Sequence, residues 1–155
     1  MSGNGAPSLD LQAPGAKVAV VASSWHTQVM TGLIEGATTR LEAADCLVEV
    51  YRVPGSFELP LGCQAAIDAG YDAVVALGVI IRGGTPHFEY VSSAATNGIA
   101  QVSLASGVPV GFGLLTCDDE AQALDRAGLP DSREDKGREA AEAVLGMLAL
   151  LRRLA

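Results

Sequence analysis

The sequence predicts an α/β fold: a three-layer, flavodoxin-like domain with a four-stranded parallel sheet flanked by helices. Short apolar, β-branched runs alternate along the chain with segments whose apolar residues recur at helical spacing. Strands that alternate with helices pair in parallel through right-handed crossovers. The strands also consist of nearly continuous apolar runs, so we expect helices to cover both faces of the sheet.

Strand patterns recur four times along the chain. Residues 1–14, rich in glycine, proline and serine, predict a flexible arm, and residues 15–155 a single domain. The run KVAVVA predicts a strand over residues 17–22, and AVVALGVII predicts the most strongly buried strand over residues 73–81. Two further strands are predicted at residues 47–53 and 108–116.

Helical periodicity fills the gaps between these strands. Apolar residues recur every three to four positions over residues 27–44, after the turn at residues 82–87, and over residues 135–154. A further helix is predicted over residues 57–69, because Pro60 is tolerated in a first helical turn. A short helix is predicted over residues 119–127, where Gly128 and Pro130 end it.

Composition and charge exclude several functions. The net charge of −8 leaves no basic surface for nucleic acid or for an anionic membrane. The three cysteines (Cys46, Cys63 and Cys117) are widely spaced, in neither a metal-binding pattern nor a disulfide framework. That usage suits a reducing cytoplasm. The first residues also lack the basic and apolar regions of a signal peptide.

The longest uncharged stretch runs from Tyr90 to Cys117. Serine, threonine, asparagine and glutamine interrupt it and Pro109 divides it, so it does not fit the roughly 20 apolar residues of a membrane span. A lone small domain does not bury so long an uncharged segment on every side. The stretch therefore predicts self-association.

Residues with useful chemistry follow the predicted strands directly. Trp25 and His26 follow the first strand, Phe57 and Glu58 follow the second, and a glycine pair and His87 follow the third. In doubly wound folds, ligands bind beyond the carboxyl ends of the strands. The sequence therefore predicts a ligand site at this edge of the sheet.

The turn after the third strand holds Gly83 and Gly84 before Thr85, Pro86 and His87. Glycines ahead of a helix expose backbone N–H groups, and the helix dipole favours an anion there. We expect Thr85 at the cap position and Pro86 in the first helical turn. The pattern is typical of a phosphate cradle, although an ordinary strand-to-helix turn has it too. It is neither a Walker loop nor a dinucleotide fingerprint.

The side chains near this edge each have a functional and a structural interpretation. His87 could transfer protons near neutral pH or merely cap the helix. Trp25 could stack on a heteroaromatic ring or fill the core. Glu58, beside Phe57, could accept hydrogen bonds from a ligand or only favour a helix start. Arg126 could bind phosphate or lie in solvent.

Several motifs in a fixed order resemble the lumazine synthase family. GVIIRGGTPHFEYV at residues 78–91 resembles the family signature, and VPGSFELP at residues 53–60 resembles a second motif. The remaining motifs are ASSW at residues 22–25, PVGFGLLT at residues 109–116, QALDRAG at residues 122–128, and Lys136-Gly137. The resemblance extends from about Lys17 to the C-terminus.

This resemblance implies an enzyme of riboflavin biosynthesis that condenses 5-amino-6-(D-ribitylamino)uracil with 3,4-dihydroxy-2-butanone 4-phosphate to 6,7-dimethyl-8-ribityllumazine. It implies His87 as the general acid/base. The implied contacts to the ribitylaminouracil are Trp25, Ser56, Phe57, Glu58, Val79, Ile80, Ile81 and Phe112. Those implied for the butanone phosphate are Gly84, Thr85 and Arg126. No metal, flavin or nucleotide cofactor is implied, because positioning and proton transfer can carry the reaction.

The resemblance also implies a homo-oligomer, a pentamer or a multiple of one. Phe112 and Arg126 of a neighbouring subunit would complete each site, and riboflavin synthase is a candidate partner. Residues 129–135 form a linker with a proline and four charges. Longer linkers here accompany free pentamers in the family, so we expect a pentamer rather than a sixty-subunit shell.

Three residues depart from the family pattern. Glu89 stands where Asp is frequent, Gly111 where a larger aliphatic residue is common, and Ala121 where Glu is usual. One alternative function is a catalytically silent paralogue that binds flavin or lumazine or forms a shell, although the intact His87 and Arg126 argue against silence. A flavodoxin-like binding module is a more distant alternative, because it would need a phosphate loop that this chain lacks.

Overall fold

The structure is a computed structural model that describes residue 5 and residues 11–155. Most of the predicted N-terminal arm, residues 1–4 and 6–10, lies outside the described residues. The strands are β1 (Lys17–Ser23), β2 (Leu47–Val53), β3 (Ala73–Ile81) and β4 (Val110–Cys117). The helices are α1 (Thr27–Ala43), the 3₁₀ turn η1 (Ser56–Glu58), α2 (Leu59–Asp68), α3 (His87–Ser106), α4 (Glu120–Leu124) and α5 (Lys136–Leu154).

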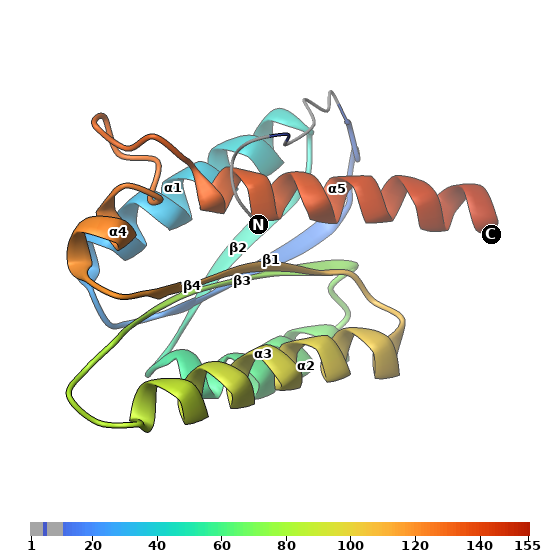
Figure 1. Cartoon of the computed structure of the whole chain (residues 1–155). Helices are drawn as coiled ribbons and strands as arrows, with labels where there is room; N and C mark the ends of the chain where they lie inside the picture. The colour runs from blue at the N-terminus through green and yellow to red at the C-terminus, as the bar shows by residue number, and fades with distance from the viewer. Residues whose placement is uncertain (1–4, 6–10) are drawn as a thin grey trace.

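All four strands pair in parallel, in the order β2-β1-β3-β4. Helices α1, α4 and α5 lie on one face of the sheet and α2 and α3 on the other, which makes three layers (Figure 1). The predicted three-layer α/β fold is therefore confirmed. After β1, the chain places β2 on one side of β1 and β3 on the other side. The direction in which strands are added to the sheet therefore reverses between β1 and β3. At such a switch point the loops diverge and leave a crevice beyond the strand ends.

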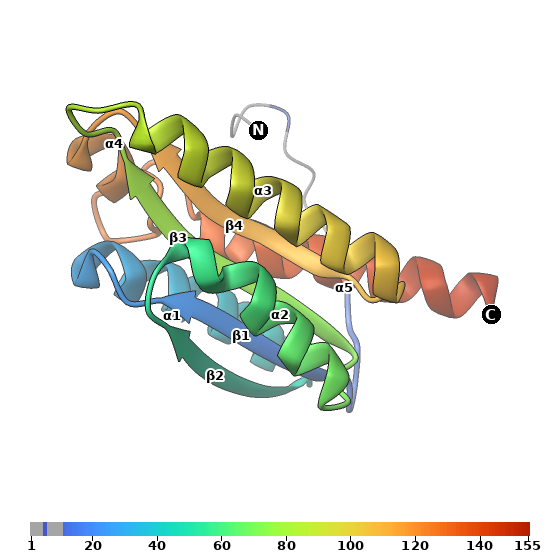
Figure 2. The ribbon, with the colours of Figure 1, turned by 90° about the horizontal axis from the view of Figure 1, so that it is seen from below.

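Alternate residues of the central strands fill two cores, because successive side chains of a strand point to opposite faces. Val18 and Val20 pack with Leu33 of α1 and Leu145 of α5 in the larger core. The smaller core holds the β1 and β3 residues of opposite parity together with the inner faces of α2 and α3. Figure 2 shows these two helices side by side across their face of the sheet.

Helices cover both faces of the sheet, as expected, but β2 at its edge is largely exposed. Five of its seven residues are exposed, among them Leu47, Val50 and Tyr51. β2 is an edge strand that pairs only with β1. An apolar sequence does not distinguish an edge strand from a central one, because that difference depends on which neighbours pair with the strand.

Pro60 divides the helix that the sequence predicts over residues 57–69. Residues Ser56–Glu58 form a 3₁₀ turn, and α2 begins only at Leu59. Pro60 has no N–H to donate to the carbonyl of Ser56, so the α-helical hydrogen-bond pattern cannot extend through it toward the N-terminus.

Close packing of α5 depends on glycine. A Cβ on Gly137 would collide with the backbone carbonyl of Leu33 in α1, and one on Gly111 of β4 would collide with the carbonyl of Ala140. Helix α5 therefore lies directly against α1 and the sheet. None of the helices within residues 11–155 is both long and apolar enough to cross a bilayer.

Candidate active site

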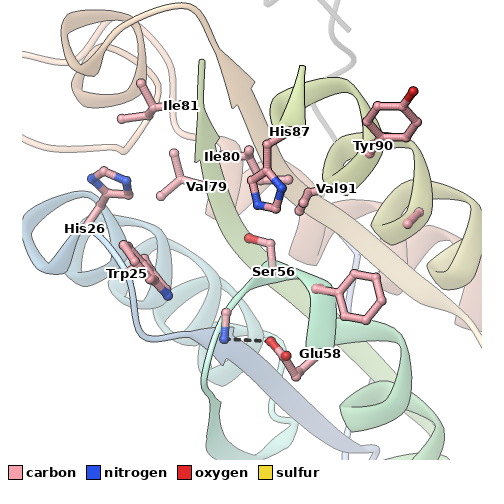
Figure 3. A pocket seen from close by; sticks show the side chains of 13 residues that line it. Trp25, His26, Ser56, Glu58, Val79, Ile80, Ile81, His87, Tyr90 and Val91 are labelled. Atoms are coloured by element: carbon pink, nitrogen blue, oxygen red, sulfur yellow. Dashed lines mark hydrogen bonds between the residues drawn. The ribbon is translucent and has the colours of Figure 1, made fainter. Parts of the chain in front are cut away.

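A pocket of ≈ 780 Å³ opens beyond the carboxyl ends of the strands. Its volume lies within the range of small-molecule sites, about 300–1,000 Å³. The pocket brings together eight residues that the family resemblance implicated: Trp25, Ser56, Phe57, Glu58, Val79, Ile80, Ile81 and His87 (Figure 3). They come from the loop after β1, from η1, from the end of β3 and from the start of α3.

Trp25 forms one wall and is not core filler, because it is 66% exposed in the isolated chain. The Ser24 hydroxyl donates to the Val53 carbonyl at 2.8 Å, which ties this loop to the end of β2. His26, which follows Trp25, has a left-handed backbone conformation with φ of 58°. Non-glycine residues seldom adopt that conformation, and where they do they cluster at functional sites.

The opposite wall consists of η1. The Glu58 carboxylate accepts a hydrogen bond from the backbone N–H of Gly55 at 3.1 Å, which orients it at the pocket (Figure 3). Ser56 is buried against β3, and a Cβ on Gly78 would lie only 2.8 Å from its hydroxyl oxygen. Phe57 is 62% exposed and lines the pocket together with Ser56 and Glu58.

The floor is the last part of β3, where this strand extends beyond β1. β1 pairs with β3 only as far as Leu77, whereas β4 pairs with β3 up to Ile81. One edge of the backbone from Val79 to Ile81 therefore faces the pocket without a strand partner. Such an edge can donate and accept hydrogen bonds to a planar ligand.

The turn at residues 82–87 is exposed throughout. α3 begins at His87, and Pro86 rather than Thr85 takes the cap position, so the predicted cap is one residue too early. The reason is that Pro86 adopts a helical φ of −65° without an N–H of its own. The Thr85 hydroxyl instead accepts a hydrogen bond from the His87 N–H at 3.5 Å.

Five further residues line the pocket: His26, Gly55, Tyr90, Val91 and Ala94. The last three follow His87 by three, four and seven positions, which is the spacing of one helix face. That spacing could have identified them from the sequence. Among residues 5 and 11–155, no group of three His, Cys, Asp or Glu side chains is arranged to hold a metal ion.

Four residues implied by the resemblance do not line the pocket: Gly84, Thr85, Phe112 and Arg126. Phe112 is half exposed on the edge strand β4. Arg126 is not simply solvated, because its Nη1 donates to the Gln122 carbonyl at 2.9 Å. Its Nε also lies 3.5 Å from the Glu134 carboxylate.

Arg82, at the start of the turn, dominates the electrostatics beside His87. Its guanidinium contacts the carboxylates of Glu89 at 2.6 Å and Asp118 at 3.1 Å. The hydrogen bonds to Arg82 hold the pKa of both carboxyls below their ordinary values, and those same bonds raise the pKa of Arg82. All three groups therefore stay charged at neutral pH.

A pocket at the switch point of a doubly wound parallel sheet, with a histidine at a helix start beside it, defines an α/β enzyme that acts on a small molecule. A family model described as 6,7-dimethyl-8-ribityllumazine synthase matches residues 15–152. The chain belongs to the 6,7-dimethyl-8-ribityllumazine synthase family, whose members are enzymes of riboflavin biosynthesis.

Curated relatives agree over nearly the whole chain. A 6,7-dimethyl-8-ribityllumazine synthase of Clavibacter sepedonicus is 63% identical, over 98% of this chain and 97% of the relative. One from Leifsonia xyli subsp. xyli is 60% identical, over 99% of both chains. One from Streptomyces coelicolor is 56% identical, over 98% of this chain and 96% of the relative. The family resemblance inferred from the sequence motifs is confirmed.

Proposed function

We propose that this chain condenses 5-amino-6-(D-ribitylamino)uracil with 3,4-dihydroxy-2-butanone 4-phosphate to 6,7-dimethyl-8-ribityllumazine, phosphate and water. The observation that carries this proposal is the make-up of the pocket. The flat indole of Trp25, the oriented carboxylate of Glu58, an open strand edge and the His87 ring converge on a volume suited to a small heterocycle. Family membership supports the same reaction.

In this proposal the ribitylaminouracil lies across the floor of the pocket. Trp25 stacks on the pyrimidine, because an exposed indole offers a large flat apolar face. The free backbone edge from Val79 through Ile80 to Ile81 pairs with polar groups of the ring. Ser56, Phe57 and Glu58 hold the ribityl chain, whose hydroxyls donate to the Glu58 carboxylate.

The butanone phosphate binds beside it at the β3–α3 turn. Backbone N–H groups of Gly84 and Thr85 at the N-terminus of α3 donate to the phosphate, and the helix dipole supports the negative charge. His87 transfers protons during imine formation, phosphate loss and dehydrating ring closure. Positioning two reactants together supplies the rest of the rate increase, so we propose no metal or organic cofactor.

Each site needs a second chain in this proposal. Phe112 and Arg126 of a neighbouring subunit cover the heterocycle and bind the phosphate, respectively. Both residues lie outside the pocket of their own chain, and Phe112 is half exposed. Large apolar side chains are also exposed on η1, α2 and α3: Phe57, Leu61, Tyr90 and Leu104. Contact between copies of the chain would bury them.

The three cysteines form no disulfide, which fits a cytoplasmic location. Cys46, Cys63 and Cys117 are buried and unpaired, and burial raises the pKa of the Cys63 thiol to about 12. Free cysteines are typical of a reducing compartment. We propose riboflavin synthase as a macromolecular partner, which co-purification of the two proteins would test.

Turnover with both substrates tests the proposed reaction. The protein is incubated with ribitylaminouracil and butanone phosphate while the lumazine absorbance is followed, and omission of either substrate serves as the control. We expect catalysed product formation with both substrates only. Lumazine binding without any turnover would instead identify the catalytically silent paralogue.

A further inference from the structure

We infer that Arg82 is a positioning residue that clamps the β3–α3 turn and thereby sets the direction of His87. This inference rests on the proposed function, in which His87 transfers protons and the turn binds phosphate. The clamp joins three segments: the end of β3, the first turn of α3 and the residue after β4.

The turn has little packing of its own. A Cβ added to Gly83 or Gly84 would meet no atom within 4 Å, and residues 82–87 are all exposed. Glycine has more backbone freedom than any other residue. Side-chain packing therefore cannot hold the turn in one conformation, and the contacts at its two ends must do so.

Arg82 supplies those contacts on both sides. Its Nη1 donates to Glu89 at 2.6 Å and its Nε donates to Asp118 at 3.1 Å, while its backbone N–H donates to the Cys117 carbonyl at 2.9 Å. The guanidinium carbon also lies 4.3 Å from the centre of the Phe88 ring. Arg82 thus contacts the two residues that directly follow His87.

The guanidinium group matters for its shape as well as its charge. Its planar fork presents several N–H donors in fixed directions and can stack on an aromatic face, which an ammonium group does less well. Lys at this position would keep the charge but lose the two divergent hydrogen bonds. The guanidinium already donates to Glu89 and Asp118, so we assign it to holding the turn and not to binding the phosphate.

Stability alone does not explain this arrangement. Arg82, Glu89 and Asp118 are each about half exposed, and exposed ion pairs add little to the free energy of unfolding. A small energy is nevertheless enough to select one orientation of a turn that has few other contacts. Misplacement of a reacting group by about 1 Å can lower the rate by about a hundredfold.

The clamp also depends on the length of the Glu89 side chain. Its carboxylate reaches Arg82 from the first turn of α3. The shorter Asp would end about one methylene earlier, so Glu89→Asp lengthens or breaks the contact. This substitution removes neither the charge nor any residue that lines the pocket.

The test compares Arg82→Ala, Arg82→Lys and Glu89→Asp with the matched control Arg138→Ala. The control removes an ion pair of similar length, Arg138 to Glu142 at 3.1 Å, on α5 away from the pocket. We expect Arg82→Ala to lower kcat by about tenfold to a hundredfold. Arg82→Lys and Glu89→Asp should fall between Arg82→Ala and the unchanged protein, and Arg138→Ala should keep full kcat.

Two further readouts separate positioning from general damage. Binding of ribitylaminouracil alone should be unchanged in Arg82→Ala, because none of its proposed contacts lies in the turn or bonds to the Arg82 side chain. Amide hydrogen exchange over residues 83–88 should accelerate in Arg82→Ala and not in Arg138→Ala. If Arg82→Ala does not fold, Arg82→Lys carries the same three measurements.

The inference is overturned if kcat stays at the level of the unchanged protein, or if uracil binding weakens as much as kcat falls. Unchanged exchange over residues 83–88 also overturns it. Absence of turnover in the unchanged protein would contradict the proposed function instead. The exchange comparison would still decide whether Arg82 clamps the turn, because it requires no substrate.

Discussion

His87 is the first residue of α3, and its ring points into the pocket between the strand end and η1 (Figure 3). We expect His87→Ala to lower kcat by about 10²- to 10⁴-fold, the usual contribution of a general acid or base. Ribitylaminouracil binding and the unfolding midpoint should be nearly unchanged, because the ring is exposed. Steady-state kinetics measures kcat, calorimetric titration measures uracil binding, and thermal unfolding measures the midpoint. Full activity at saturating substrate would show that His87 has another role.

Arg126 follows α4, with its guanidinium held by the Gln122 carbonyl and Glu134. We expect Arg126→Ala to raise the KM for the sugar phosphate by at least about tenfold, because a charge-assisted hydrogen bond contributes about 1.5–3 kcal/mol. The KM for the uracil should change far less. Arg126→Lys should restore only part of the affinity, since it lacks the planar fork. An equal loss for both substrates would argue against a phosphate contact.

At the level of elements, α5 offers two glycines in opposite surroundings. Gly137 meets the backbone of Leu33, whereas a Cβ on Gly146 would lie an ordinary 3.6 Å from Leu11. We expect Gly137→Ala to lower the free energy of unfolding by about 1–3 kcal/mol, because α5 must move away from α1. Gly146→Ala should raise it by about 0.5–1 kcal/mol, since alanine restricts the unfolded chain.

Urea unfolding at one fixed protein concentration measures both variants, because association also contributes to stability. The two substitutions are chemically identical and lie on the same helix, so they serve as controls for each other. Equal effects of the two would mean that helix propensity, and not the close contact of α5 with α1, governs the stability of this element.

At the level of the whole molecule, we expect a pentamer. The linker between α4 and α5 is long and carries proline and four charges. Its conformation sets the angle between the two helices and so affects how pentamers could meet. A closed ring also covers the exposed apolar residues without contacts between rings. Light scattering should give a particle of five chain masses, and one of sixty chain masses would overturn the pentamer but not the enzyme.

Much of the fold could be predicted because its signals are local. The continuous apolar run of residues 73–81 identified β3 with its observed bounds, and the alternation of strands and helices identified a parallel sheet. The motif order identified the family, and parallel strand ends gave the edge where the pocket lies. Errors arose at helix starts, where Pro60 and Pro86 moved the boundary.

The sequence by itself determined the order of the elements, the family and eight of the residues that line the pocket, because each of these signals is a pattern within a short segment. Only the tertiary structure decided that β2 is an exposed edge and that β3 extends beyond β1. It alone paired Arg82 with Asp118, 36 residues away. Contacts between distant segments depend on how the layers pack, and no local pattern records that packing.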